Sequence, residues 1–548
     1  MGKGLPAPTK KGDPTAAPSP QLDSDNAHLG VPTAPRRRAS DANLPPVSTA
    51  ALFQQRVHQH DDQLQSDLEE APLFVLITTY LNYFVLILFG HVRDIMGKMF
   101  KRKKYRHLRQ SNGYAPLTSD FESFYTRRLY KRIRDCWNRP TTGVPSRTVT
   151  ILERESKDFN DTFRLTGTTR EVINLASYNY LGFAQSHGPC ADDVEQTVLQ
   201  YRVGISSPRQ EVGTLDIHHE LEDLVARFTG KEASMVISMG YATNSTTLPS
   251  LVGKGCLIIS DELNHASLVY GARLSGASIR VFKHNNMADL RQLLREVISQ
   301  GQPRTHRPWK KILVVVEGLY SMEGNVCNLP EIIKLKKEFK FYIYLDEAHS
   351  IGALGRHGRG VCDLLGVDPA DVDIMMGTFT KSFGAAGGYI AGDRALIDRL
   401  KLYNHSCIYS EPMTPLVCQQ VLTSMRIIMG EVGGDEGKHR ISQLAENSQF
   451  FMSRLKEMGF IVYGNDGSPV IPLLLFNPAK IPAFSRELLK RGVAVVVVGY
   501  PATPIITSRA RFCISASHTR KDLEFALEKI SEVGDLLMLK ISNHRARC

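Results

Sequence analysis

Short apolar runs alternate with helix-like stretches from about Val149 to Leu400. These runs are rich in β-branched and aromatic residues, and they read SMVIS, CLIIS, SIRVF, KILVVVE, FYIYLDE, DIMMGTF and YIAG. Strand-like runs that are each followed by a helical pattern are typical of a mostly parallel sheet with helices on both faces. We therefore expect a large doubly wound α/β domain over residues 149–410.

The pattern changes after about Pro412. A long helical stretch comes first, and the apolar runs SPVIPLLLF, VAVVVVG and RARFCISAS follow it. This order indicates a smaller C-terminal α+β domain over residues 411–548. The chain has 548 residues, which is long enough for two such domains and further segments.

One apolar segment precedes these domains. Ala71 to Gly90 is twenty residues without a charged side chain, about the length that spans the hydrocarbon of a bilayer. We predict a membrane-anchor helix over residues 69–92. Acidic residues precede the segment and basic residues follow it, so the positive-inside rule places the rest of the chain in the cytosol. A buried or re-entrant helix is the alternative, because Thr78, Thr79 and Asn82 lower the hydropathy.

Residues 93–148 form a basic segment after the apolar one. Apolar or aromatic residues recur there every fourth position, and basic residues lie between them; the apolar set is Phe121, Tyr125, Leu129, Ile133 and Trp137. Such an amphipathic helix either lies on a membrane or packs on the main domain or a partner, and the pattern does not choose between these. Residues 1–65 are rich in Pro, Ala, Ser and Asp, a composition that predicts a disordered tail.

Charge and cysteine usage narrow the class of protein. The formal net charge is +11, and much of it clusters after the apolar segment, which favours a membrane surface over a nucleic acid as partner. The nine cysteines include no C-x-x-C pair. We therefore expect no disulfide framework, no metal site and a reducing compartment.

The stretch YIYLDEAHSIG, Tyr342 to Gly352, has two interpretations. DEAH after a buried strand is typical of ATP-driven helicases, which also need a G-x-x-x-x-G-K-[ST] phosphate loop earlier in the chain. The one similar Lys-Ser pair, at Lys381, follows a threonine and comes after DEAH. The helicase interpretation is therefore disfavoured, and an Asp that binds a pyridine ring is the better hypothesis.

Polar residues follow five of the predicted strands: Gly240-Tyr241, residues 261–267, residues 317–321, residues 346–349 and residues 378–381. Ligands of such sheets bind beyond the carboxyl ends of the strands, so these segments should meet at one site. The set suits pyridoxal 5′-phosphate. Lys381 can bind its aldehyde, Asp346 can keep its pyridine nitrogen protonated, and phosphate can lie at a helix start. The other candidate contacts are His265 stacked on the ring, His349 orienting Asp346, and Gly240, Tyr241, Thr378 and Thr380 at the phosphate.

Several long motifs resemble one family. GTFTKSFGAAGGYIAG, YLDEAHSIGALGRHGRG, LNHASLVYGARLSGA, VEGLYSMEG, RQEVGTLDIHHELE and SYNYLGF are similar to motifs of the α-oxoamine synthases, which are fold-type I (aspartate-aminotransferase-like) pyridoxal phosphate enzymes. The apolar segment, FESFYTRRLYKRIRDCWNRP and VVVVGYPATP resemble the lysine-bearing subunit of the eukaryotic members that use L-serine and palmitoyl-CoA. The resemblance runs from about Glu69 to the C-terminus.

The resemblance implies a reaction and a setting. The reaction is a decarboxylating condensation of L-serine with palmitoyl-CoA to 3-ketosphinganine, the first step of sphingolipid synthesis. It implies Lys381, His265 and Asp346 as catalytic residues, His349 near the phenolic oxygen of the cofactor, and Ser321 at the cofactor. It also implies a heterodimer with a homologous lysine-lacking subunit, in the endoplasmic reticulum membrane with the catalytic domain in the cytosol.

Two positions depart from soluble family members. Gly499-Tyr500-Pro501 stands where they carry an Arg before a Pro-Pro stretch, and Tyr178 stands where they carry an Asn. The resemblance therefore implies that Arg511, or a residue of the partner chain, binds the serine carboxylate, with Tyr178 nearby. Two rival functions are a synthase that uses glycine or alanine with another acyl-CoA, and a non-catalytic scaffold subunit of a lipid-synthesis complex.

Overall fold

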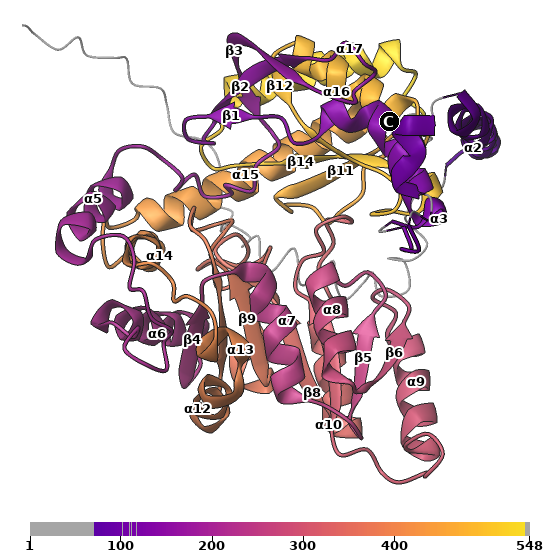
Figure 1. Cartoon of the computed structure of the whole chain (residues 1–548). Helices are drawn as coiled ribbons and strands as arrows, with labels where there is room; N and C mark the ends of the chain where they lie inside the picture. The colour runs from indigo at the N-terminus through magenta and orange to yellow at the C-terminus, as the bar shows by residue number, and fades with distance from the viewer. Residues whose placement is uncertain (1–70, 101, 109, 111, 117, 543–548) are drawn as a thin grey trace, which may run out of the picture. The chain divides into compact units, whose positions relative to one another are not determined.

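The structure is a computed structural model that describes residues 71–100, 102–108, 110, 112–116 and 118–542. The predicted tail over residues 1–65 lies outside this range. A seven-stranded sheet forms the centre of the large domain, in the order β4-β10-β9-β8-β7-β5-β6 (Figure 1). β5 to β9 are mutually parallel, and β10 is antiparallel to both of its neighbours. The strands are β4 (Ala233–Ile237), β5 (Leu257–Asp261), β6 (Ser278–Phe282), β7 (Ile312–Glu317), β8 (Tyr342–Asp346), β9 (Ile374–Thr378) and β10 (Gly388–Gly392).

Helices cover both faces of this sheet, as the alternating pattern predicts. Apolar side chains on one face pack against α7 (Gly240–Leu251), α8 (Ala266–Ser275) and α12 (Arg394–Tyr403). Those on the other face pack against α6 (Asp216–Thr229), α9 (Met287–Gln300), α10 (Leu329–Phe339) and α14 (Pro415–Met429). Further helices are α5 (Pro189–Tyr201), α11 (Val361–Leu365) and α13 (His405–Ile408). The doubly wound prediction is confirmed.

The C-terminal part forms two smaller sheets. β11 (Val470–Leu474), β14 (Arg509–Cys513) and β13 (Val496–Val498) make an antiparallel sheet, flanked by α15 (Glu436–Glu457), α16 (Lys480–Lys490) and α17 (Arg520–Leu536). The other sheet has the order β1-β2-β3-β12, with β1 (Thr141–Thr142), β2 (Thr148–Glu155), β3 (Arg164–Asn174) and β12 (Val493–Ala494). The boundaries at 149 and 410 stay predictions. The pairing of β3 with β12 shows that residues 164–174 join strands of the C-terminal part rather than the large sheet.

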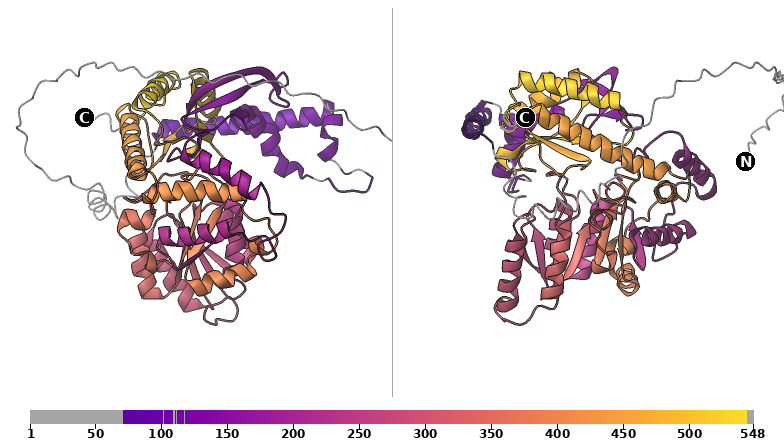
Figure 2. Two further views of the ribbon diagram at one scale, coloured as in Figure 1. Left: turned by 90° about the vertical axis from the view of Figure 1, so that its left-hand side faces the viewer. Right: turned by 180° about the vertical axis from the view of Figure 1, so that it is seen from behind.

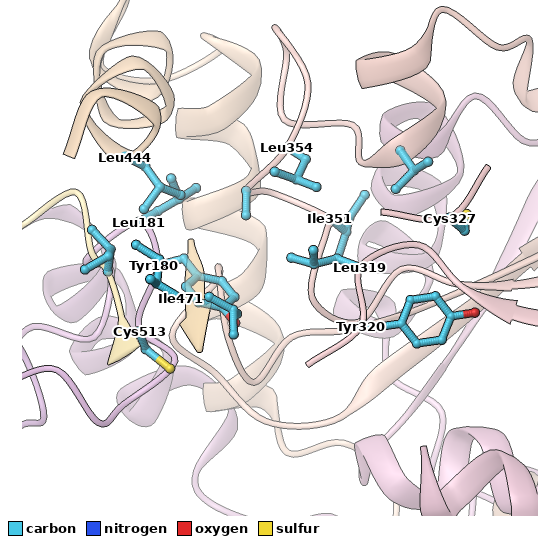
Figure 3. Packing of buried hydrophobic residues seen from close by; sticks show 14 of the residues in the cluster. Tyr180, Leu181, Leu319, Tyr320, Cys327, Ile351, Leu354, Leu444, Ile471 and Cys513 are labelled. Atoms are coloured by element: carbon cyan, nitrogen blue, oxygen red, sulfur yellow. The ribbon is translucent and has the colours of Figure 1, made fainter. Parts of the chain in front are cut away.

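A continuous core joins the two parts. Tyr180 and Leu181 follow β3, and they share a buried cluster with Leu444 of α15 and Ile471 of β11 (Figure 3). The same cluster includes Ile351, which lies just beyond β8, and most of the apolar residues on that face of the large sheet. Because this core is continuous, residues from both parts are held close to the end of β8.

The apolar segment forms helix α2 (Leu73–Phe100), and it meets the length and hydropathy expected of a membrane span. Figure 2 shows α2 and the helical turns after it, in indigo and purple, beside the C-terminal part. One stripe of the helix, which includes Val75, is buried and packs near Leu474 and Phe476. The other sides are apolar and exposed.

Residues 120–136 are helical throughout, but not as one regular α-helix. The elements are α3 (Asp120–Tyr125), the π-helical η2 (Thr126–Tyr130), α4 (Lys131–Ile133) and the 3₁₀ turn η3 (Arg134–Cys136), and a further 3₁₀ turn, η1, spans Arg102–Leu108. His91 of α2 stacks on Phe124 at 4.2 Å between ring centroids. The Tyr125 hydroxyl donates a hydrogen bond to the Tyr500 carbonyl, and Trp137 Nε1 donates to the Val497 carbonyl at 3.0 Å. In the structure this segment packs on α2 and on the C-terminal part.

Candidate active site

Strand ends meet at one edge of the large sheet, as predicted. Asp346 is the last residue of β8, and it is paired in register with Glu317, the last residue of β7. Thr378 ends the neighbouring strand β9. All three side chains are buried. The carboxyl ends of parallel strands therefore supply acidic and hydroxyl groups at adjacent positions.

Asp346 is held by two neutral donors. Its Oδ2 accepts a hydrogen bond from Asn244 Nδ2 at 2.7 Å, and its Oδ1 accepts one from the Ala348 N–H at 2.9 Å. Neither donor carries a charge, so neither forms an ion pair with the carboxyl group. A carboxylate has about four acceptor positions, which leaves lone pairs for a cationic ligand group.

His265 is the N-cap of α8, and its backbone and ring are both fixed. Its N–H donates to Glu317 Oε1, and its Nδ1 lies 2.8 Å from Ser267 Oγ. Burial lowers the pKa of His265, and the nearby Lys381 lowers it further against the opposing effect of Asp346. The imidazole is therefore neutral at physiological pH, which suits a ring that stacks on an aromatic cofactor.

Lys381 follows β9 in a tight turn. The Phe379 N–H donates to the Gly387 carbonyl at 3.0 Å, and the Ala385 N–H donates to the Phe379 carbonyl at 3.0 Å, which closes the turn. Burial lowers the pKa of Lys381 to about 8, although the charges of Asp346 and Glu317 oppose the shift. A substantial fraction of this amine is therefore unprotonated near neutral pH, as a nucleophile or base requires.

Tyr178 lies between Lys381 and Arg511. Lys381 Nζ is 5.7 Å from the centroid of the Tyr178 ring, and the Arg511 guanidinium carbon is 4.7 Å from it. Arg511 is 4% exposed, and its Nε has no hydrogen-bond partner among the described residues. Its Nη1 is 3.9 Å from Met322 Sδ, a weak acceptor. No carboxylate of a described residue pairs with this guanidinium. A buried, unpaired charge is destabilising, so the arrangement indicates a place for an anion.

His349 lies beside the same tyrosine. Its Nδ1 is 2.8 Å from the Tyr180 hydroxyl, and its ring meets the Tyr178 ring edge-on at 5.3 Å. Burial, together with the positive charges of Lys381 and Arg511, holds the pKa of His349 well below its usual range. His349 therefore stays neutral. Among the described residues His349 has a side-chain hydrogen bond with Tyr180 and none with Asp346, so its role in orienting Asp346 stays a prediction.

The predicted phosphate contacts also come together. Gly240 begins α7, and a Cβ added there would lie 3.1 Å from Thr378 Cγ2, so glycine lets the helix start approach β9. Thr380 Oγ1 donates to Thr378 Oγ1 at 3.2 Å. Tyr241 is half exposed, and its ring lies 6.2 Å from that of His265. Ser321 is 9% exposed and makes no side-chain hydrogen bond with a described residue.

Three residues of this site were not among the predicted contacts. Glu317 ends a strand that the sequence singled out, but its contact with the His265 backbone has no signal in the sequence. Tyr180 lies in the SYNYLGF motif, where its partner His349 is 169 positions away. Asn244 lies inside a helix and resembles any polar residue on a helix surface. Only the folded arrangement identifies these three.

The residues present fit pyridoxal phosphate. A partly unprotonated amine, a buried carboxylate with spare acceptor positions, and a neutral imidazole lie around the ends of β8 and β9. The start of α7 beside Thr378 offers backbone N–H groups to a phosphate. The described residues include no group of His, Cys, Asp and Glu side chains that could hold a metal ion.

Comparisons with known proteins agree with this chemistry. A family model described as aminotransferase class I and II matches residues 170–530. Serine palmitoyltransferase 2 of Schizosaccharomyces pombe is 51% identical over 533 residues, which cover 96% of this chain and 88% of the relative. A solved Sphingomonas wittichii serine palmitoyltransferase is 28% identical with a TM-score of 0.66, and the match covers 78% of this chain and 98% of that one.

A further solved structure carries the cofactor. It is a high-resolution structure of a serine palmitoyltransferase (SPT) with pyridoxal phosphate (PLP). That protein is 27% identical to this chain, with a TM-score of 0.63, and the match covers 73% of this chain and 92% of that chain. The same family is indicated by the fold, by the residues that fit the cofactor, and by both the related sequences and the solved structures. The chain belongs to the aminotransferase class I and II family and, within it, to the pyridoxal phosphate-dependent serine palmitoyltransferases.

Proposed function

We propose that this chain is the lysine-bearing catalytic subunit of a serine C-palmitoyltransferase. The reaction joins L-serine to the acyl group of palmitoyl-CoA, and it releases carbon dioxide and free CoA to leave 3-ketosphinganine. The observation that carries the proposal is the buried Arg511, whose Nε has no partner among the described residues, on the ring of Tyr178 with Lys381 nearby. A small amino acid fits between such groups if its carboxylate binds the arginine and its Cα faces the lysine.

Bound pyridoxal phosphate withdraws electrons from the Cα of an attached amino acid, which weakens the Cα–H bond. We propose that Lys381 Nζ accepts that proton, because its lowered pKa keeps the amine partly unprotonated. Asp346 would hold the pyridine nitrogen protonated, and His265 would stack on the ring. His349 would contact the phenolic oxygen, and Gly240, Tyr241, Thr378 and Thr380 would bind the phosphate.

We infer that the chain works at a membrane and with a partner. α2 has the length and hydropathy of a span, and its exposed residues are mostly apolar. An enzyme held at the membrane would meet palmitoyl-CoA and its lipid product where both partition. The proposed setting is the endoplasmic reticulum with the catalytic domain in the cytosol, and the proposed partner is a homologous lysine-lacking subunit.

The visible absorbance of the purified protein tests this function. We expect an imine band from pyridoxal phosphate that shifts when L-serine is added, and Lys381→Ala should lack the band of the free enzyme. Glycine and alanine serve as comparison substrates, because a larger shift with either of them would favour the rival synthases. A protein that shows no band with the partner subunit present would support the scaffold function instead.

A further inference from the structure

We propose that Asn244 is a positioning residue that joins Asp346 and His265 into one hydrogen-bonded unit. This inference rests on the proposed function only in that these two residues hold the cofactor. Asn244 lies on α7, one turn after Gly240, so the helix that starts at the phosphate site also brings an amide to the carboxylate. Asn244 is 1% exposed, and both ends of its amide are hydrogen-bonded.

Asp346 and Tyr344 bind opposite ends of the Asn244 amide. The Tyr344 hydroxyl donates to Asn244 Oδ1 at 2.8 Å, and Tyr344 is fully buried on β8, two residues before Asp346. Burial raises the pKa of Tyr344 well above its usual range, and the charge of Asp346 adds to the shift, so the phenol stays protonated. A rotated amide would set its oxygen against the Asp346 carboxylate, which only accepts hydrogen bonds, and that contact would be unfavourable.

The second arm of the unit runs through Ser267. Asn244 Nδ2 donates to Ser267 Oγ at 3.0 Å, and Ser267 Oγ lies 2.8 Å from His265 Nδ1. Helices α7 and α8 meet closely here: a Cβ added to Gly271 would lie 2.8 Å from the Asn244 carbonyl oxygen. This close approach holds Ser267, one turn earlier on α8, within reach of the amide.

The direction of donation along this arm sets the state of His265. The Ser267 hydroxyl accepts from Asn244, so its own proton is available to His265 Nδ1, which also accepts from the Ser267 N–H at 3.2 Å. A neutral imidazole that accepts at Nδ1 carries its proton on Nε2. Asn244 thus acts on both cofactor contacts. It orients the carboxylate directly, and through the Ser267 hydroxyl it reinforces the histidine tautomer that the Ser267 N–H also favours.

Two variants and a matched control test the proposal. The measured quantity is the affinity of the purified protein for pyridoxal phosphate, obtained by absorbance titration without substrate. We expect Asn244→Leu to weaken binding by about 10- to 100-fold. Removal of a residue that hydrogen-bonds a ligand-binding side chain typically has an effect of this size. Tyr344→Phe should weaken it several-fold. Tyr389→Phe is the control, because Tyr389 is also fully buried and its hydroxyl has no partner among the described residues. It should bind as the wild type does.

A third variant separates positioning from a merely structural role. Asn244→Asp keeps the acceptor for Tyr344 but places a carboxylate against Asp346. The other titratable groups nearby are His265, Glu317, Tyr344 and Lys381. We expect its affinity deficit to shrink as the pH falls from 8 to 6, because the introduced carboxyl can donate again once it is protonated. Wild-type affinity in folded Asn244→Leu, or a deficit in Asn244→Asp that does not change with pH, would overturn the proposal. Absence of cofactor binding in the wild type would instead count against the proposed function.

Discussion

Lys381 is buried at a cost to the protein without cofactor. Its pKa in the folded chain is about 8, below the value of about 10.4 for an unfolded lysine, because burial disfavours the charged amine. The unfolded state therefore binds more protons between these two values, and the free energy of unfolding rises as the pH rises through them. Below pH 8 the burial of the charged amine lowers the free energy of unfolding by its full amount, on the order of 3 kcal/mol.

Replacement of the lysine should remove this cost. We expect cofactor-free Lys381→Met to be more stable than the cofactor-free wild type at pH 7, and the difference should shrink as the pH is raised toward 10. Thermal unfolding of both proteins at a series of pH values measures it. Equal stabilities at pH 7, or a constant difference across the series, would show that burial does not strain this amine.

At this scale the sequence predicts the reacting groups but not their supports. Lys381 and Asp346 carry chemistry that few other residues supply. Asp346 ends a recognisable strand and Lys381 follows one, so both could be proposed as site residues before the fold was known. Asn244, Tyr180 and Glu317 are common residue types whose roles depend on partners far along the chain. Hydrogen bonds between distant positions leave no periodic pattern in a single sequence.

Helix α2 shows how one element can combine two surfaces. The buried stripe that includes Val75 and Tyr83 faces the protein, whereas the exposed sides carry large apolar residues that water does not favour. A membrane would cover those exposed sides. The structure has a helix in the predicted segment, but α2 begins at Leu73 and continues to Phe100, so the bounds of the anchor at residues 69–92 stay a prediction.

Membrane retention and folding should therefore respond to different faces of α2. We expect a triple variant with serine at Phe74, Leu81 and Leu88, which are 63%, 58% and 50% exposed, to leave washed membranes while its melting temperature is unchanged. Val75→Ser, on the docked stripe, should instead lower the free energy of unfolding by about 1–2 kcal/mol. Flotation of membranes and thermal unfolding give the two readouts. A triple variant that still pellets completely would place the anchor elsewhere.

The segment after α2 shows what a periodic pattern can and cannot predict. Apolar residues recur every fourth position, whereas an α-helix has about 3.6 residues per turn, so a regular helix would carry the stripe slowly around its axis. The π-helical turn Thr126–Tyr130 lengthens one turn, which offsets part of this drift. The repeat predicts a helix, but it does not predict the wider turn.

On the scale of the whole molecule, exposed aromatic residues near the site point to a partner. Tyr241 and Tyr270 are 43% and 50% exposed, and Leu274 and Tyr409 are also exposed. Tyr241 directly follows the start of α7, so a protein that covers this surface would approach the phosphate site. The doubly wound fold was predictable from strand order, whereas the pairing of β3 with β12 joins strands that are far apart in the sequence and was not.

We expect the isolated chain to have little activity and to regain it on mixing with the homologous lysine-lacking subunit. Size-exclusion chromatography with light scattering measures the assembly, and release of CoA measures the reaction. Replacement of Tyr241 and Tyr270 by serine should weaken the complex, whereas serine at the exposed Leu402 on α12 should affect it less. Full activity of the purified chain alone would exclude an obligate heterodimer.

The contacts of Tyr125 with the Tyr500 carbonyl and of Trp137 with the Val497 carbonyl fasten the helical segment after α2 to β13 and the connection that leads into β14. β14 carries Arg511 in its centre. The proposed membrane anchor and the proposed substrate-binding arginine therefore share one scaffold. A mutation that adapts the proposed anchor to a thicker or thinner bilayer would act on the same connection that supports the arginine, so natural selection on one of these two proposed properties would constrain the other.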